Sequence, residues 1–249
     1  MKAVILAAGK GTRLGELTKN IPKPMIEVAG KPVCEHVMRR IQRAGIDDFV
    51  LVTKYLSEKV RDYFGDGSRF GMHVEYVEQG EKYGTGYAFA CARELAGDGP
   101  ALMTFADVVM SAGNYDGALM VYTNHRGGGV VTLNEVPDPC RGADVQLDEE
   151  NKIARLVEKP PPGTKPTYLN SSGLFVFDPI IFNYLDRLEP SPRGEYELPD
   201  AINAMAADGI AIYPYHLQGF WKDVGTVEDL KVATELIEDE ELSDGICSA

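Results

Sequence analysis

The chain has 249 residues, enough for one large α/β domain or for at most two small ones. Hydrophobic residues make up 44% and charged residues 25%, the balance of an ordinary globular protein. The formal net charge of -13 argues against nucleic acid and anionic membrane surfaces as partners. No apolar run approaches the length that spans a bilayer, so we expect a cytoplasmic protein.

The first half of the chain alternates between short apolar runs and amphipathic stretches. The runs predict strands at 2–8, 48–53, 73–77 and 100–106, and the stretches predict helices at 33–44, 57–64 and 85–95. This alternation predicts a Rossmann-like, doubly wound α/β fold with a mixed, mainly parallel sheet flanked by helices. Ligand sites in such folds lie at the carboxyl ends of the strands.

The second half has fewer helices between its strands. Strands are expected at 129–134, 144–148, 153–158, 173–177 and 210–216, and helices at 180–188, 198–207 and 227–237. The linker 159–166, KPPPGTKP, predicts a stiff surface loop. The acidic tail 238–249 is expected to fray into solvent, which leaves one domain over 1–237.

The four cysteines are scattered, with neither a CxxC pair nor a histidine at ligand spacing: Cys34, Cys91, Cys140 and Cys247. This spacing argues against a zinc site or a disulfide framework and predicts reduced thiols.

A glycine-rich turn, Gly9-Lys10-Gly11-Thr12-Arg13, directly follows the first strand. Glycines let a backbone approach a ligand closely and turn its N–H groups toward phosphate oxygens. The spacing fits neither the dinucleotide motif G-x-G-x-x-G nor the P-loop G-x-x-x-x-G-K-[ST]. By itself, such a turn could equally be a plain connection between a strand and a helix.

Lys23 lies between two prolines in the string Ile21-Pro22-Lys23-Pro24-Met25. The prolines stiffen the backbone and discourage helix, so the ammonium group is presented from an extended segment. A cation held in this way suits a triphosphate, although an isolated PKP is also an ordinary surface turn.

The run LAAGKGTRLGELTKNIPKPMIEVAGKP resembles the opening of the sugar-1-phosphate nucleotidyltransferases, LAAGxGTRLxPLTxxxPKPLxxVxGKP. Glu16 departs from it, because the family usually has proline there. The resemblance implies that Arg13 and Lys23 are catalytic cations opposing the charge of the phosphates. It also implies that the turn residues Ala8, Gly9, Gly11 and Thr12 bind the nucleotide.

The string Gln79-Gly80-Glu81-Lys82-Tyr83-Gly84-Thr85 is similar to the base-recognition segment of that family, Q-x-x-x-x-G-T before a helix. A glutamine amide offers a donor and an acceptor to a base edge, and a helix start offers free N–H groups. Gln79, Gly84 and Thr85 are therefore assigned to nucleotide binding by the resemblance, although a plain loop and helix start would look alike.

Two aspartates are implied as ligands of Mg²⁺. Asp107 follows the buried strand 100–106, where the family has Gly-Asp and this chain has Ala106-Asp107. Asp223 lies in Trp221-Lys222-Asp223-Val224-Gly225-Thr226, which resembles the motif W-x-D-V-G-T. Two carboxylates suit Mg²⁺, which completes its octahedron with phosphate oxygens and water. The structural alternatives are a turn aspartate at 107 and a helix cap at Thr226.

The remaining contacts implied by the resemblance are to the sugar phosphate: Gly142, Glu158, Lys159 and Gly173. Glu158 and Lys159 could also be a solvated strand end. The stretch 170–173 reads Asn-Ser-Ser-Gly where many members have N-A-G or N-T-G, so Ser171 departs from the pattern. The string 194–200, GEYELPD, resembles the family's GEYEL-T-D stretch.

These residues predict a nucleotidyltransferase that joins a nucleoside triphosphate, with UTP or dTTP favoured, to a sugar 1-phosphate and releases pyrophosphate. Residues 1–125 would mainly bind the nucleotide and 126–237 the sugar phosphate, and a homo-oligomer is compatible with the sequence. Two alternatives stay open: a cytidylyltransferase acting on phosphocholine or inositol phosphate, and a catalytically silent nucleotide-sensing subunit.

Overall fold

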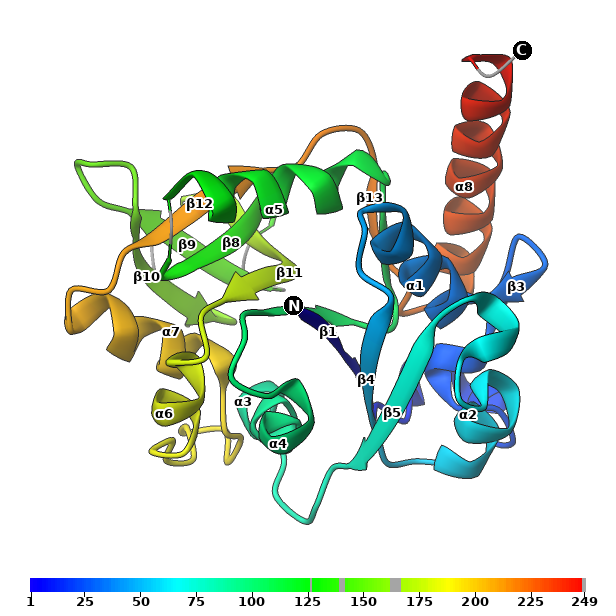
Figure 1. Cartoon of the computed structure of the whole chain (residues 1–249), viewed down its shortest axis with the longest axis horizontal. Helices are drawn as coiled ribbons and strands as arrows, with labels where there is room; N and C mark the ends of the chain where they lie inside the picture. The colour runs from blue at the N-terminus through cyan, green and yellow to red at the C-terminus, as the bar shows by residue number, and fades with distance from the viewer. Residues whose placement is uncertain (126, 139–141, 162–166, 248–249) are drawn as a thin grey trace.

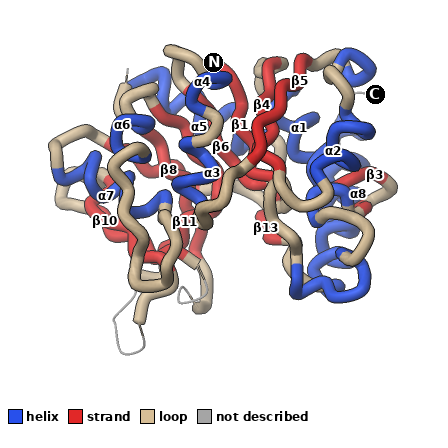
Figure 2. The backbone as a smooth tube through the Cα atoms, turned by 90° about the horizontal axis from the view of Figure 1, so that it is seen from below, coloured by secondary structure: helices blue, strands red, loops and turns tan. Residues whose placement is uncertain are grey.

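The computed structural model describes residues 1–125, 127–138, 142–161 and 167–247. Nine strands of this described part form one twisted mixed sheet, and helices lie along both of its faces (Figure 1). The expected Rossmann-like, mainly parallel α/β fold is confirmed. Seen from below, α6, α7 and β10 lie at one end of the molecule and α1, α2 and α8 at the other (Figure 2).

The N-terminal part of the sheet is parallel. Its strands run in the order β5-β4-β1-β6, with bounds β1 Lys2–Ala7, β4 Asp48–Thr53, β5 His73–Glu78 and β6 Ala101–Phe105. The strands β1, β4 and β6 are apolar and almost fully buried, as strands covered on both faces require, whereas β5, HVEYVE, is the edge strand and is only partly buried. Because all four strands are parallel, their carboxyl ends meet at one edge of the sheet.

Mixed pairing extends the sheet beyond β6. The strand that joins the two parts is β11, Leu169–Phe177, which is antiparallel to β8 along one side and, on the other side, to β9 at its start and to β6 at its end. The other strands here are β8 Gly129–Glu135, β9 Ala143–Leu147, β10 Ile153–Glu158 and β12 Ile212–His216. The register of β11 shifts between Ser171 and Phe175, where Gly173 has a φ of 90°. This irregularity lets one strand pair with different partners at its two ends.

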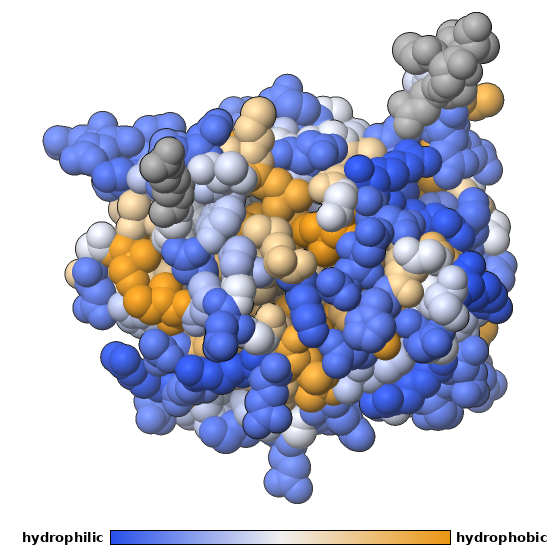
Figure 3. All heavy atoms as spheres, viewed as in Figure 1, coloured by the Kyte–Doolittle hydropathy of each residue, from blue (hydrophilic) through white to orange (hydrophobic). Residues whose placement is uncertain are grey.

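Alternate residues of β1 point into two separate hydrophobic cores. Ala3 and Ile5 pack into the core that includes α1, α2, α5 and α8, and Val4 and Leu6 pack into the core beneath α3, α4, α6 and α7. Burying β1 on both faces fixes it at the centre of the molecule. On the face that Figure 3 shows, hydrophilic residues dominate the rim and apolar residues are exposed in patches nearer the centre.

The helices agree with the prediction in most places. Their bounds are α1 Val33–Arg43, α2 Ser57–Phe64, α3 Thr85–Ala90, α4 Arg93–Ala96, α5 Gly113–His125, α6 Ile181–Leu185, α7 Leu198–Ala207 and α8 Val227–Cys247. Three 3₁₀ turns complete the helical structure of the described residues: η1 Thr12–Thr18, η2 Lys23–Met25 and η3 Ser68–Phe70. Four short strands lie outside the main sheet: β2 Glu27–Val28, β3 Lys31–Pro32, β7 Val108–Met110 and β13 Trp221–Asp223.

Two helix predictions need correction in the first half. The helix expected over 85–95 is two helices, because Ala92 N–H donates to the carbonyl of Phe89 at 3.0 Å, a tight three-residue turn that breaks the α-helical ladder. Helix α5 was not expected at all. Its sequence carries two glycines and its apolar residues do not gather on one face.

The C-terminal segment 238–247 continues α8 rather than fraying, and the helix projects from the body of the molecule (Figure 1). Glu240 explains the extension. Its carboxylate accepts a hydrogen bond from the Arg40 guanidinium at 2.8 Å and another from the Ala112 N–H at 2.9 Å. A buried cation and a half-buried main-chain donor thus hold this part of the acidic segment against the protein.

Some predictions fall on parts that are only partly described. Residues 162–166 of the proline-rich linker and Cys140 lie outside the described residues. Cys34 is buried and Cys91 is half-buried, and both are free thiols. Among the described helices none is long and apolar enough to cross a membrane.

Candidate active site

Two strand ends at the centre of the sheet begin the candidate site. Leu6 of β1 pairs with Phe105 of β6, and the Ala106 N–H extends this pairing with a 3.0 Å bond to the Leu6 carbonyl. The glycine turn that follows β1 therefore starts beside Asp107. This is the edge where ligands bind in open α/β sheets.

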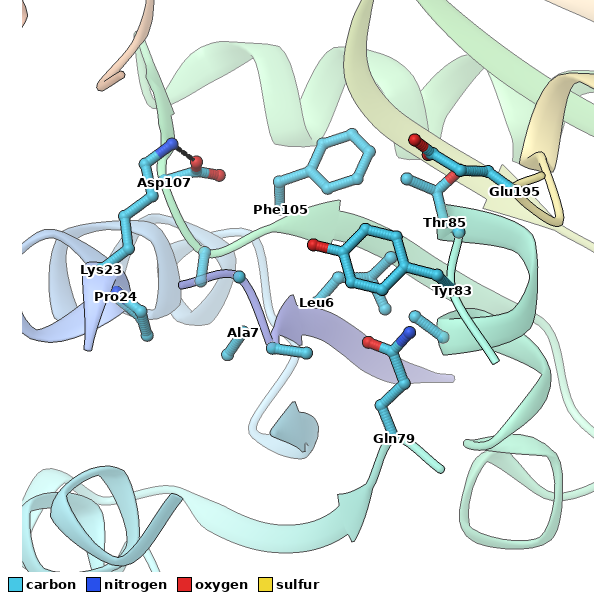
Figure 4. Close-up of a pocket in the computed structure, with 15 residues that line it drawn as sticks. Leu6, Ala7, Lys23, Pro24, Gln79, Tyr83, Thr85, Phe105, Asp107 and Glu195 are labelled. Carbon is cyan, nitrogen blue, oxygen red and sulfur yellow. Dashed lines mark hydrogen bonds and ion pairs between the residues drawn. The ribbon is translucent and has the colours of Figure 1, made fainter. Parts of the chain in front are cut away.

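A pocket of about 200 Å³ opens at this edge (Figure 4). It collects residues from five segments that are far apart in the sequence, and its lining is Leu6, Ala7, Ala8, Gly9, Lys23, Pro24, Gln79, Tyr83, Gly84, Thr85, Ala88, Phe105, Ala106, Asp107 and Glu195. Seven residues predicted from the sequence are among them: Ala8, Gly9, Lys23, Gln79, Gly84, Thr85 and Asp107. The structure thus brings the predicted phosphate, base and metal segments around one cavity.

A two-stranded ladder brings the second aspartate to the first. Strand β13 pairs antiparallel with β7, which places Asp223 opposite Val108. The Val224 N–H then donates to the Asp107 carbonyl at 2.9 Å. Both aspartates therefore lie on adjacent segments of the chain, at the same end of this ladder.

Lys23 lies between these two carboxylates. Its ammonium group forms an ion pair with Asp107 and lies 3.6 Å from Oδ1 of Asp223 (Figure 4 shows the first pair). Pro22 is extended, but Lys23 itself begins the 3₁₀ turn η2 with Pro24 as its second residue, so the expected extended segment ends one residue before the lysine; the two prolines still restrict the backbone that presents it. A β-carbon at Gly11 would lie 3.0 Å from Cβ of Lys23, so the glycine turn packs directly against the lysine stem.

Arg13 approaches the same cluster from η1. Its guanidinium lies 3.9 Å from Oδ2 of Asp223 and packs over Gly225, where a β-carbon would lie 3.0 Å from Cζ. Its side chain is largely exposed, so it can reach a ligand at the pocket mouth. Thr12 begins η1 and is exposed too.

The charges of this cluster suit a divalent cation. Burial, and then the neighbouring Asp107 carboxylate, raise the pKa of Asp223 above its usual range, while Lys23 and Arg13 oppose the shift. Two adjacent carboxylates that need a cation between them are the donor set that Mg²⁺ takes from proteins. In the part of the chain that the structure describes, no three acidic, histidine or cysteine side chains gather closely enough to form a complete metal cage.

The segment predicted to recognise the base, residues 79–85, forms the opposite wall of the pocket. Gln79 is buried, and its side-chain amide donates to the Lys82 carbonyl at 3.1 Å. Gly84 has a φ of 126°, and a β-carbon there would lie 2.3 Å from the Tyr196 carbonyl oxygen. The hydroxyl of Thr85 accepts a hydrogen bond from the Leu198 N–H at 3.1 Å. Segment 194–198 therefore fixes the start of α3, a contact that the GEYEL string did not specify by itself.

The residues predicted for the sugar phosphate do not line the described pocket, but they are linked to it. The Lys159 N–H donates to the Gly142 carbonyl at 2.8 Å, which joins the ends of β9 and β10. At Gly173 a β-carbon would lie 2.8 Å from the ring of Phe105, a pocket residue. Glu158 lies 3.6 Å from the Arg193 guanidinium.

Sequence reasoning did not single out Arg193, Tyr83, Phe105 or Glu195 as site residues. Arg193 lies among three glutamates, Glu158, Glu195 and Glu197, at 3.6, 3.1 and 3.5 Å. Burial raises the pKa of Glu197, and Arg193 opposes this shift. The only available signals were the GEYEL string and the position of Tyr83 within the base-reading string. Neither says that the two segments touch.

Comparison with known proteins decides the family. The nucleotidyl transferase family model matches residues 2–240. The chain belongs to this family. It is 35% identical over 238 residues to the low-salt glycan biosynthesis nucleotidyltransferase Agl11 of Haloferax volcanii, a match that covers 95% of this chain and 66% of that protein. It is 33% identical over 240 residues to a glucose-1-phosphate thymidylyltransferase of Streptomyces antibioticus, covering 96% of this chain and 67% of that protein.

The fold also matches solved structures of the same kind of enzyme. A Bacillus anthracis protein assigned as a glucose-1-phosphate thymidylyltransferase and crystallised with sucrose superposes with a TM-score of 0.86. The two are 28% identical, and the match covers 96% of each chain. Together these matches place the chain among the sugar-1-phosphate nucleotidyltransferases. The chain spans about half to two thirds of the length of the curated relatives that it matches, from 51% to 67%.

Proposed function

We propose that the chain catalyses a Mg²⁺-dependent transfer of a nucleotidyl group from a nucleoside triphosphate to a sugar 1-phosphate, with release of pyrophosphate. The observation that carries the proposal is the cluster of Lys23, Asp107 and Asp223 at the mouth of a pocket whose far wall holds Gln79. This arrangement offers charge for phosphates at one end and an amide for a base edge at the other.

The reaction needs positioning and charge stabilisation more than covalent chemistry. An oxygen of the sugar phosphate attacks the α-phosphorus of the triphosphate, the new P–O bond forms, and the bond to pyrophosphate breaks in line with it. Because a phosphate monoester is already an anion, no side chain has to act as nucleophile. The cations Lys23 and Arg13 would hold the negative charge that moves onto the pyrophosphate.

The two aspartates would hold Mg²⁺, which neutralises phosphate charge when it is bound. Lys23 occupies the space between these carboxylates in the described structure. Its ammonium group therefore has to move away from them to reach a phosphate. The stiff segment around Pro22 and Pro24 keeps the lysine close enough to make this exchange within the site.

The identity of the nucleotide base is proposed from the hydrogen-bonding groups of Gln79. One N–H of the Gln79 amide donates to Lys82, which leaves its second N–H and its carbonyl oxygen for a base. An imide edge, as in uracil and thymine, matches this donor and acceptor, so UTP or dTTP is the proposed nucleotide. The thymidylyltransferase relative supports this choice.

Residues 1–125 would mainly bind the nucleotide and 126–237 the sugar phosphate, through Gly142, Glu158, Lys159 and Gly173. Two residues of the second half are exceptions: Glu195 lines the pocket, and Asp223 lies beside Lys23 and would be one of the two metal ligands.

A substrate panel tests the proposal. Pyrophosphate release would be measured with each of the common triphosphates, in the presence of Mg²⁺, against hexose 1-phosphates, phosphocholine and inositol phosphate. We expect turnover with UTP or dTTP and a hexose 1-phosphate, and none after chelation of the metal. Turnover confined to CTP with a non-sugar phosphate would overturn the assigned acceptor. Nucleotide binding without any turnover would instead indicate a sensing subunit.

A further inference from the structure

The proposed function gives no role to Tyr83, a large aromatic residue in the pocket. Tyr83 lines the cavity, yet its side chain is 61% exposed. In the close-up its ring lies across the pocket between Gln79 and Phe105, in front of Leu6 (Figure 4). Among the described residues, its ring stacks on no other aromatic ring, and its hydroxyl has no hydrogen-bond partner. An exposed tyrosine ring in a cavity offers a flat apolar face on which a planar ligand can pack.

The backbone that carries Tyr83 is held from both sides. The Tyr83 carbonyl accepts a hydrogen bond from the Tyr196 N–H at 2.8 Å. The carbonyl of the preceding residue, Lys82, accepts the hydrogen bond from the Gln79 amide, and the Lys82 ammonium lies 4.5 Å from the centre of the Tyr196 ring. The following residue, Gly84, packs tightly on Tyr196. The ring is therefore presented from a fixed backbone and retains only its two side-chain torsions.

We propose that Tyr83 is a nucleotide-binding residue that stacks on the face of the nucleobase whose edge is read by Gln79. The inference rests on the proposed function, because it requires a nucleotide in this pocket. A planar base inserted beside Gln79 would have the end of β1, Leu6 to Ala8, on one side and the Tyr83 ring on the other. A tyrosine loses little conformational freedom when it packs, so such a contact stabilises the complex at low entropic cost.

Stacking predicts a particular pattern of affinities. A base on an aromatic ring contributes an interaction whose loss weakens binding roughly 5- to 150-fold. We expect the lower half of this range, because one face of the ring stays in solvent. The contact belongs to the ring and not to the hydroxyl, so phenylalanine should replace tyrosine. It also belongs to the base, so a ligand without a base should not detect the change.

The contribution of the base can be separated from that of the phosphates by measuring the binding of UTP and of inorganic tripolyphosphate to the full chain, with Mg²⁺ present. Titration calorimetry would compare the wild type with Tyr83→Phe, Tyr83→Leu and Tyr83→Ala, and with Tyr168→Ala as a control. Tyr168 is 57% exposed and does not line the pocket. We expect Tyr83→Phe and Tyr168→Ala to bind UTP as the wild type does, Tyr83→Ala to bind it roughly 5- to 20-fold more weakly, and Tyr83→Leu to fall between them. All variants should bind tripolyphosphate equally.

The outcomes distinguish this proposal from the one on which it rests. If the wild type binds both ligands and Tyr83→Ala binds UTP equally well, stacking is wrong while the nucleotide site stands. An equal loss for UTP and tripolyphosphate would also overturn stacking, because the effect would then lie at the phosphates. If the wild type binds neither ligand, the proposed function fails, and the role of Tyr83 fails with it.

Discussion

The main-chain N–H of Val224 donates a hydrogen bond to the main-chain carbonyl of Asp107 at 2.9 Å. Val224 directly follows Asp223, so this bond links the backbones of the two aspartate segments at the end of the β7–β13 ladder. Because the link is between backbones, the separation of the Asp107 and Asp223 main chains does not depend on the rotamer of either side chain. This backbone pairing keeps the two carboxylates in one cluster with the Lys23 ammonium between them.

Removing the Lys23 ammonium should impair turnover severely. We expect Lys23→Ala to lower kcat by roughly 10²- to 10³-fold, the loss typical of one preorganised group that stabilises developing charge. Pyrophosphate release under saturating substrate measures this change. Lys19→Ala serves as the control, because Lys19 is exposed and forms a surface ion pair with Glu16 at 2.8 Å. Near-full activity of Lys23→Ala would show that the lysine has no catalytic role.

The same lysine should compete with the metal when no nucleotide is present. Since Lys23 pairs with both Asp107 and Asp223 in the described structure, its removal leaves the two adjacent carboxylates without the ammonium group between them, with only the more distant Arg13 guanidinium beside Asp223. We expect Lys23→Gln to bind Mn²⁺, used as a paramagnetic probe for Mg²⁺, about tenfold more tightly than the wild type in the absence of nucleotide. Electron paramagnetic resonance of free Mn²⁺ measures this affinity without any catalytic assay. The double variant Lys23→Gln, Asp223→Asn should lose the gain, and unchanged Mn²⁺ affinity in Lys23→Gln would contradict the exchange.

Asp229 should make the loop that carries Asp223 sensitive to acid. Burial alone would raise the pKa of Asp229, but hydrogen bonds from Lys222 and Thr226 bring it below its ordinary value of 3.8. Its carboxylate accepts from the Thr226 N–H at 2.8 Å, while the Asp229 N–H donates to the Thr226 hydroxyl at 3.3 Å, the reciprocal bonds of a capping box.

A carboxyl group with a lowered pKa stabilises the folded state fully above its ordinary pKa, and this contribution is lost as the pH falls through the folded-state pKa. We therefore expect Asp229→Asn to lower the free energy of unfolding by roughly 1 to 2 kcal/mol at neutral pH. The difference from the wild type should shrink as the pH falls below about 4. Denaturant unfolding at several pH values measures it. A difference that stays constant down to acid pH would show that the carboxylate charge is not involved.

Glu240 should stabilise the whole protein although it lies in the acidic C-terminal segment. The Arg40 side chain is 5% exposed, so loss of its carboxylate partner leaves a nearly buried charge without its ion pair. We expect Glu240→Ala to lower the free energy of unfolding by roughly 2 to 3 kcal/mol, somewhat less than for a fully buried pair. Thermal and denaturant unfolding measure the loss. Glu238→Ala, at an exposed position of the same helix, should stay near the wild type, and equal stability of the two variants would mean that the segment is held by other contacts.

Much of the fold follows from local sequence. The strands β1, β4 and β6 could be predicted because each is an apolar run that ends at turn residues, and α1 because its apolar residues repeat at helical spacing. Helix α5 could not be predicted in this way. Buried Asn114 in its first turn bonds to the main chain of Gln218, its carbonyl oxygen accepting from the N–H and its amide donating to the carbonyl, each at 2.8 Å. The helix thus depends on a partner far along the chain.

By itself the sequence determined which residue types this protein has for its chemistry: the glycine turn with Arg13, the proline-flanked Lys23, Gln79 before a helix start, and two aspartates in motifs. Only the tertiary structure decided that Lys23 lies between both aspartates, that segment 194–198 fixes the start of α3, and that Tyr83 faces the pocket. The physical reason is that a motif reflects local backbone requirements and ligand chemistry within a few residues. Contacts such as the β7–β13 ladder depend instead on how strands far apart in the chain pair when the two cores close around β1.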